Sequence, residues 1–205
     1  MIYKNANSGF SLVEVLVAIT ILLLVTVGPL RIMTQVNKSN SFSTDQTTAF
    51  FLAQEGLELL QSGRDNLVLG DLRDSFVGET TQPNPWTEFT SIFDSCITGG
   101  GANKRCGLAA AANGTGYTVT DCGTTIGNCL LYTTSNQNNR RLTHTAAGNT
   151  MTPYTRSLQI AIIPGSGGRP QGAVATSTVT WRSGDFADEQ KVELVTYLTN
   201  VYDTN

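Results

Sequence analysis

Charge is scarce in this chain, and histidine is nearly absent. Only 14% of the 205 residues are charged, the net charge is -3, and His144 is the single histidine. The chain lacks the basic surface that binding to nucleic-acid phosphates requires, which argues against DNA or RNA as a general partner. His144 has no neighbouring Cys or acid in the polar run 140–145, so we expect an exposed loop residue without a catalytic role.

The motifs of enzymes and cofactor sites are missing as well. The Gly-rich run 165–168 has no Gly-Lys-Ser/Thr ending and no helical pattern after it, which predicts a hairpin loop. Glu55 and Glu58 stand three residues apart in a predicted helix, and we expect them to form a solvated helix edge. We therefore predict a protein that is not an enzyme and has no cofactor, metal or small-molecule substrate.

What the chain does have is one long apolar run near its N-terminus. From Phe10 to Val27 the only ionisable side chain is Glu14. As a helix, this run is about 27 Å long at 1.5 Å per residue, close to the thickness of the hydrocarbon core of a bilayer. The run predicts a membrane-spanning helix.

A carboxylate in such a run needs a physical explanation. An ionised acid in hydrocarbon costs on the order of a few kcal/mol unless it is paired, neutralised or near the interface. Ser11 and Glu14 fit the S-x-x-E capping box, which explains an acid in the first turn. The alternative is that proteolysis makes Phe10 the first residue, and Glu14 holds the positive charge created there. A secretory signal peptide fits poorly, because the run is long and residues 28–30 are not an A-x-A-like cleavage site.

Residues 8–14, with the sequence Ser-Gly-Phe-Ser-Leu-Val-Glu, resemble the N-terminus of type IV pilins and of the pseudopilins of type II secretion systems. The resemblance implies that a prepilin peptidase cuts between Gly9 and Phe10 and then N-methylates Phe10. It also implies that Glu14 pairs with the Phe10 amino group of a neighbouring subunit during assembly. The leader departs from the family pattern because Lys4 is its single lysine.

The resemblance implies an α+β fold of the pilin type, with a long N-terminal helix packed on a C-terminal antiparallel β-sheet. Residues 1–9 form the leader, and residues 10–62 form the helix, whose first half, 10–30, spans the membrane. Residues 63–205 form a β-rich periplasmic or extracellular domain. We expect Gly63 to stop the helix, because glycine is the common residue just after a helix end.

Helical periodicity is clearest at residues 49–60, where Phe50, Ala53, Leu57 and Leu60 share one face. This face is predicted to pack on the globular domain. The pattern over these residues and those that follow also resembles minor, pilin-V-like subunits.

Three strands are predicted near the C-terminus. Residues 158–162, 173–182 and 192–202 are rich in β-branched or aromatic residues or alternate between apolar and polar. Turn-rich connections separate them, so we predict an antiparallel meander. Residues 99–149, rich in Gly, Ala, Asn and Thr, are predicted to form a variable surface region.

The four cysteines, Cys96, Cys106, Cys122 and Cys129, lie close together in the middle of the chain. Their spacing contains no C-x-x-C pair, which disfavours a zinc site. An even number of cysteines in an exported chain predicts two disulfides, for which three connectivities are open. We favour Cys96 with Cys106 and Cys122 with Cys129, because both pairs close small loops.

These features predict a structural subunit, a minor pilin, of a type IV pilus-like filament. The alternatives are a type II secretion pseudopilin and a filament-tip adhesion or DNA-uptake module that uses residues 99–149, with Arg140 and Arg141 as its local hint. The expected partners are prepilin peptidase, other pilin or pseudopilin subunits, the inner-membrane assembly platform and the cytoplasmic membrane. The expected location is the inner membrane as a single-pass protein, and then a surface filament or a periplasmic pseudopilus.

Overall fold

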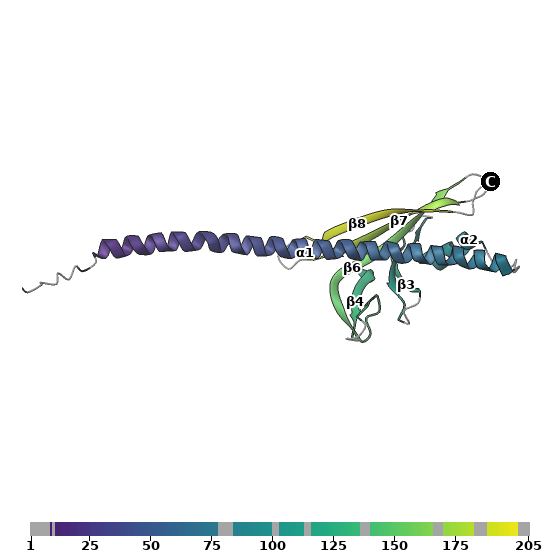
Figure 1. Cartoon of the computed structure of the whole chain (residues 1–205), viewed down its shortest axis with the longest axis horizontal. Coiled ribbons are helices and arrows are strands. Elements are labelled where there is room, and N and C mark those ends of the chain that lie inside the picture. Colours follow the sequence, from purple (N-terminus) through teal and green to yellow (C-terminus); the bar gives the residue numbers. More distant parts are fainter. Residues whose placement is uncertain are drawn as a thin grey trace, which may run out of the picture. The chain divides into compact units, whose positions relative to one another are not determined.

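The computed structural model has the α+β layout expected from the sequence, a long N-terminal apolar helix followed by a β-sheet (Figure 1). It describes residues 9, 11–77, 84–99, 103–112, 116–135, 140–165, 170–182 and 188–200 of the 205. The chain forms two compact units, Met1–Thr44 and Asp45–Asn205.

The helices are α1 (Leu12–Val77), α2 (Pro85–Ile92) and the short 3₁₀ helices η1 (Asp94–Cys96) and η2 (Ile126–Cys129). The described strands are β1 (Ile97–Thr98), β2 (Arg105–Ala110), β3 (Tyr117–Gly123), β4 (Leu130–Thr134), β5 (Leu142–Thr143), β6 (Asn149–Pro164), β7 (Pro170–Trp181) and β8 (Gln190–Thr199).

The expectation that Gly63 stops the first helix is wrong. Helix α1 continues through Gly63 to Val77, beyond the predicted end at residue 62. A Cβ on Gly63 would lie 2.8 Å from Tyr117 Cε1 and 3.0 Å from Phe93 Cζ. The glycine therefore makes room for two aromatic rings in the middle of the helix, and its φ is not positive as a left-handed C-cap requires.

The β-sheet is built around β6. Strand β7 pairs with β6 along one side, whereas β4, β2 and, in parallel, β1 pair with it along the other. Strand β8 pairs antiparallel with β7, so the predicted meander of three C-terminal strands is confirmed (Figure 1). Two further strands complete the sheet: β3 extends it beyond β2, and β5 extends it beyond β4.

The part of α1 within the second unit packs its small and apolar residues on this sheet. Ala53, Leu57 and Leu60 are buried as the periodicity predicted, but Phe50 is 45% exposed. Gly56 allows close contact, because a Cβ there would lie 3.1 Å from the Oγ of Ser177 on β7. Burial of apolar side chains is the main stabilising contribution here, at roughly 25 cal/mol per Å².

Helix α2, which the sequence did not predict, completes the core. The Asn84 side chain caps it by accepting a hydrogen bond from the Trp86 backbone N–H at 2.8 Å. Trp86 and Phe89 lie on its buried side, with ring centroids 5.3 Å apart, and Phe93 follows at 4.8 Å from Phe89. These rings fill the space beside Tyr117, whose ring stacks on Phe93.

Two disulfides lie in the second unit, Cys96–Cys106 and Cys122–Cys129, the same pairing that the short loops favoured. The first joins η1 to β2, and the second joins β3 to the end of η2. Each closes a loop of about ten residues or fewer in sequence separation, which stabilises by roughly 2–3 kcal/mol in the chain-entropy model.

Gly63 and Gly70 of α1 have different surroundings, so their substitutions give a matched test. Gly63→Ala is expected to lower the free energy of unfolding by about 1–2 kcal/mol, because the new methyl overlaps packed rings. Gly70→Ala meets no atom within 4 Å and should raise it by up to about 1 kcal/mol through helix propensity. Thermal unfolding of the detergent-solubilised chain measures both, and equal shifts of the same sign would contradict the packing role of Gly63.

Candidate functional site

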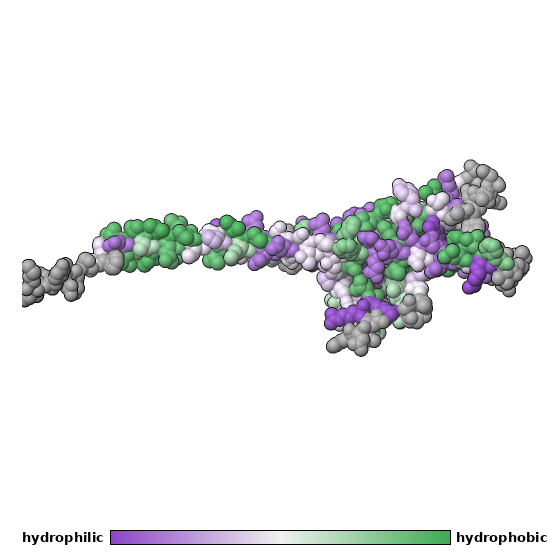
Figure 2. Space-filling model, viewed as in Figure 1, coloured by the Kyte–Doolittle hydropathy of each residue, from purple (hydrophilic) through white to green (hydrophobic). Residues whose placement is uncertain are grey.

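The first candidate site is the apolar stretch of α1, residues 12–36. Every large apolar side chain in this stretch is at least 47% exposed. Figure 2 shows hydrophobic residues, in green, over the N-terminal part of the helix. Within the described part of the chain, α1 is the one helix long and apolar enough to cross a membrane. A helix that is apolar all round needs lipid or like helices around it.

The threonine hydroxyls of this stretch are satisfied inside the helix. The Thr20 hydroxyl donates to the Leu16 carbonyl at 2.8 Å, and the Thr26 hydroxyl donates to the Leu22 carbonyl at 2.9 Å. Such hydrogen bonds let threonine enter an apolar environment at low cost. Helix α1 also runs through Pro29.

Glu14 is the exception, because it is the only ionisable residue between Ser11 and Leu30. It lies exposed in the first turn of α1, just after Ser11, whose carbonyl accepts the backbone N–H of Val15 at 3.2 Å. The N-terminal end of a helix carries a partial positive charge that favours a carboxylate. Glu14 is therefore placed where a positive terminus would be nearby.

The processing site itself lies at the limit of the described residues. Gly9 is exposed, whereas Phe10, the predicted N-methylated residue, lies outside the described residues. Cleavage after Gly9, methylation of Phe10 and pairing of Glu14 with a neighbour's Phe10 amine stay predictions.

The second unit contains a buried cation that the sequence reading missed. Arg156 of β6 is fully buried, and its Nη1 donates to the Leu52 carbonyl at 3.0 Å and to Glu55 Oε2 at 2.9 Å. Its Nη2 donates to the Leu108 carbonyl of β2 at 2.5 Å. Burial lowers the pKa of Arg156, and Glu55 opposes that shift. One guanidinium thus links α1, β2 and β6.

This pair corrects the expectation for Glu55. Its carboxylate is 39% exposed but accepts from Arg156, whereas Glu58 is an exposed residue that accepts from Gln54 at 2.8 Å. Only Glu58 is the solvated helix edge that the spacing predicted. The signal that could have revealed the pair is the position of Arg156 two residues before Leu158, because side chains two residues apart in a strand point to the same face.

His144 is not the exposed loop residue that the sequence predicted. Its ring packs on Gly107 of β2, where a Cβ would lie 2.5 Å from His144 Cδ2, and its Nδ1 lies 3.2 Å from the Leu130 carbonyl. Burial lowers the pKa of His144 to about 4, and the charge of Arg156 adds to the lowering. The neutral ring is a structural part of the unit, because β5 brings it onto a glycine distant in sequence.

The Arg141 side chain also makes hydrogen bonds within the second unit. Its Nη1 donates to the Ala111 carbonyl at 2.6 Å and to the Ala112 carbonyl at 2.9 Å. Arg140 is exposed. The pair of arginines that hinted at a nucleic-acid surface is thereby reduced to one exposed cation.

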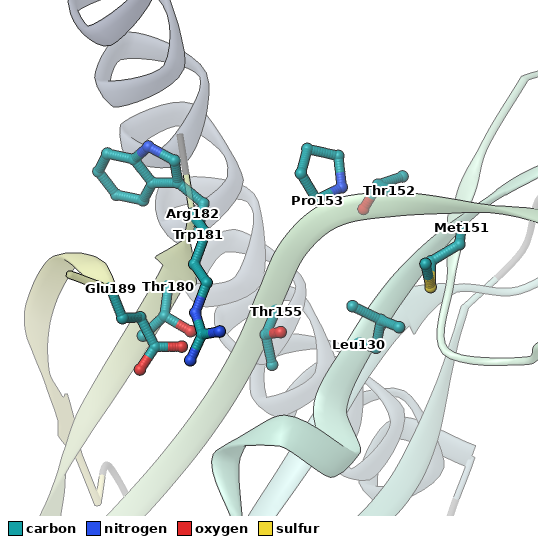
Figure 3. Close-up of a pocket in the computed structure, with 9 residues that line it drawn as sticks. All are labelled: Leu130, Met151, Thr152, Pro153, Thr155, Thr180, Trp181, Arg182 and Glu189. Carbon is teal, nitrogen blue, oxygen red and sulfur yellow. The ribbon is translucent and has the colours of Figure 1, made fainter. Parts of the chain in front are cut away.

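A groove of about 290 Å³ lies beside β6 and β7. Figure 3 shows Arg182 and Glu189 extending toward one another beside Thr180, while Trp181 points away from them. The groove is lined by Leu130, Met151, Thr152, Pro153, Thr155, Thr180, Trp181, Arg182 and Glu189.

The N-terminal stretch matches a known sequence motif. The family model described as "Prokaryotic N-terminal methylation motif" matches residues 4–28, the segment that contains Gly9, Phe10 and Glu14. The chain therefore carries a prepilin-type N-terminus at the head of an exposed apolar helix. The resemblance to pilins and pseudopilins drawn from residues 8–14 is confirmed.

One curated relative agrees with this class. The chain is similar to type II secretion system protein J of Vibrio cholerae serotype O1 (strain ATCC 39315 / El Tor Inaba N16961), with 31% identity over 92 residues. The match covers 45% of this chain and 41% of the relative, which is less than half of either protein. No solved structure matches the chain.

The buried ion pair is tested by a matched pair of substitutions. Glu55→Ala leaves Arg156 buried without its anion and is expected to lower the free energy of unfolding by about 3 kcal/mol. Glu58→Ala changes an exposed residue of the same helix and is expected to change it by less than about 0.5 kcal/mol. Denaturant unfolding measures both. Equal effects would show that the carboxylate of Glu55 contributes nothing specific.

His144 makes stability depend on pH in a defined direction. Its folded pKa of about 4 lies below the ordinary 6.5, so the unfolded chain binds the proton more readily. This contribution is fully present above about pH 6.5 and is lost as the pH falls toward 4, by up to about 3 kcal/mol at 1.36 kcal/mol per pKa unit.

The measurement is the unfolding free energy from pH 7.5 to 4, with His144→Gln as a variant that does not titrate. Subtracting the unfolding free energies of the two chains at each pH cancels the contribution of the carboxylates, which both chains share. A constant difference across this range would contradict the buried, neutral ring.

Proposed function

We propose that this chain is a structural subunit, a minor pilin, of a type IV pilus-like filament. The observation that supports the proposal most is the exposed apolar helix headed by the methylation motif, with Glu14 as its only ionisable residue between Ser11 and Leu30. In this proposal prepilin peptidase removes residues 1–9 and methylates Phe10. The mature chain is then added to the filament through residues 10–30.

The physical problem of assembly is direction and register, because lipid and neighbouring apolar helices solvate the stretch about equally well. Transfer from lipid to a bundle of like helices has little hydrophobic driving force. A charged pair in a low-dielectric core is strongly attractive and distance-dependent, so it selects one register. Glu14 and a neighbour's Phe10 amine form such a pair in our proposal.

The same stretch supports the proposed location. A single apolar helix fits a single-pass membrane anchor before assembly. The two disulfides fit a second unit that reaches an oxidising compartment. The proposed partners are other subunits of the filament, prepilin peptidase and the inner-membrane assembly platform.

A pseudopilin of a type II secretion system is the second candidate, and the similarity to protein J favours it. The two functions predict different phenotypes for a deletion of the gene. Loss of sheared surface filaments or of pilus-dependent adhesion supports a minor pilin, whereas loss of protein secretion with intact surface filaments supports a pseudopilin.

The assembly role of Glu14 has a direct test. Glu14→Leu removes the anion that holds the neighbouring terminus, and incorporation into the filament fraction is expected to fall at least about tenfold, equivalent to about 1.4 kcal/mol. Thr20→Leu, in the same helix, removes a polar group without a charge and should leave incorporation unchanged.

Intact-mass and N-terminal peptide mass spectrometry on each chain reports processing separately. The unaltered chain should begin at Phe10 and carry one extra methyl group. The proposal fails if Glu14→Leu is incorporated and methylated like the unaltered chain, or if Met1 is retained in a host with an active prepilin peptidase.

A further inference from the structure

Strand β8 is a long, regular sheet edge. In the described part of the chain it pairs with β7 alone, and the register runs without a shift from Gly172 opposite Thr199 to Trp181 opposite Gln190. The pairings of β6 with β7 and with β4 both contain register shifts. Strand β8 also contains no proline and no glycine. Its outer edge therefore presents a row of backbone N–H and C=O groups that β7 does not pair.

Core packing and two side chains of α1 hold the strand. Leu194 and Leu198 face the core, and the Gln61 side chain donates to the Thr196 hydroxyl at 3.1 Å. Asn200 N–H donates to the Gln171 carbonyl, so the Thr199 carbonyl points away from β7, and Arg64 donates to it at 3.3 Å at the C-terminal end of the outer edge. A strand fixed in this way loses little conformational entropy when another strand pairs with it.

The outward side chains of β8 have a defined order. Lys191 and Glu193 form an ion pair at 3.0 Å, and Val195 and Tyr197 follow with 52% and 73% of their surface exposed. The row thus reads cation, anion, apolar, apolar. Because the two charges balance, the edge does not repel an incoming strand by net charge.

We propose that β8 binds an extended strand of a partner protein by β-augmentation. Main-chain hydrogen bonds supply the affinity, and the side chains opposite β8 supply the selectivity. Charge complementarity requires an acidic residue opposite Lys191 and a basic residue opposite Glu193, with apolar residues opposite Val195 and Tyr197. An antiparallel partner therefore reads apolar-x-apolar-x-basic-x-acidic from its N-terminus. This site does not use the apolar stretch of α1, so it stands or falls separately from the proposed function.

The test uses a labelled synthetic peptide, Thr-Val-Thr-Val-Thr-Lys-Thr-Glu, and a second peptide in which Lys and Glu are exchanged. Binding to the full chain in detergent is measured by fluorescence anisotropy. The first peptide is expected to bind roughly three- to tenfold more tightly, because the exchange turns two attractive cross-strand pairs into repulsive ones. Hydrogen exchange should show slower exchange of β8 amides when the first peptide is bound.

The matched variant exchanges the charges of the protein, Lys191→Glu together with Glu193→Lys, and should reverse the peptide preference. Both residues are exposed, so the fold is retained. Met151→Lys, an exposed substitution on β6, is the control and should leave the preference unchanged. The proposal is overturned by equal binding of the two peptides, by no binding of either, or by self-association of the chain through β8 that excludes the peptide.

Discussion

The second unit depends on one buried cation. Arg156 cannot lose its proton under ordinary conditions, so its burial requires partners for the charge, and these come from α1 and β2. A guanidinium has donors in a fixed fork, which allows contact with two carbonyls and a carboxylate at once. The helix and the sheet are therefore joined at a point whose geometry tolerates little sliding. The neutral His144 nearby is compatible with that charge only because it stays unprotonated.

Helix α1 has different surroundings in its two parts. Residues 12–36 expose apolar side chains on every side, whereas Ala53, Leu57 and Leu60 bury theirs against the sheet of the second unit. Helical hydrogen bonds satisfy the backbone in both environments, which makes a single helix a suitable element for both. Glycine at positions 56 and 63 adapts the second part to a closely packed surface.

The features that depend on neighbouring residues could be predicted from the sequence. The apolar run around Glu14, the alternating strands after residue 157 and the pairing of cysteines in short loops could all be read from the sequence. The end of α1 could not, because the role of Gly63 depends on the rings of Phe93 and Tyr117, which lie thirty or more residues away in the sequence. The environment of His144 depends in the same way on Gly107, and that of Arg156 on Glu55. Such long-range contacts leave little trace in a window of neighbouring residues.

The Cys122–Cys129 disulfide has a consequence for how this protein can diverge. It closes the short connection between β3 and β4 on itself, with a sequence separation of 7. The connection keeps its shape through a covalent bond and needs little apolar burial of its own. Residues 124–128 can therefore accept substitutions that the core cannot, and closely related proteins can present different surfaces here on an unchanged framework.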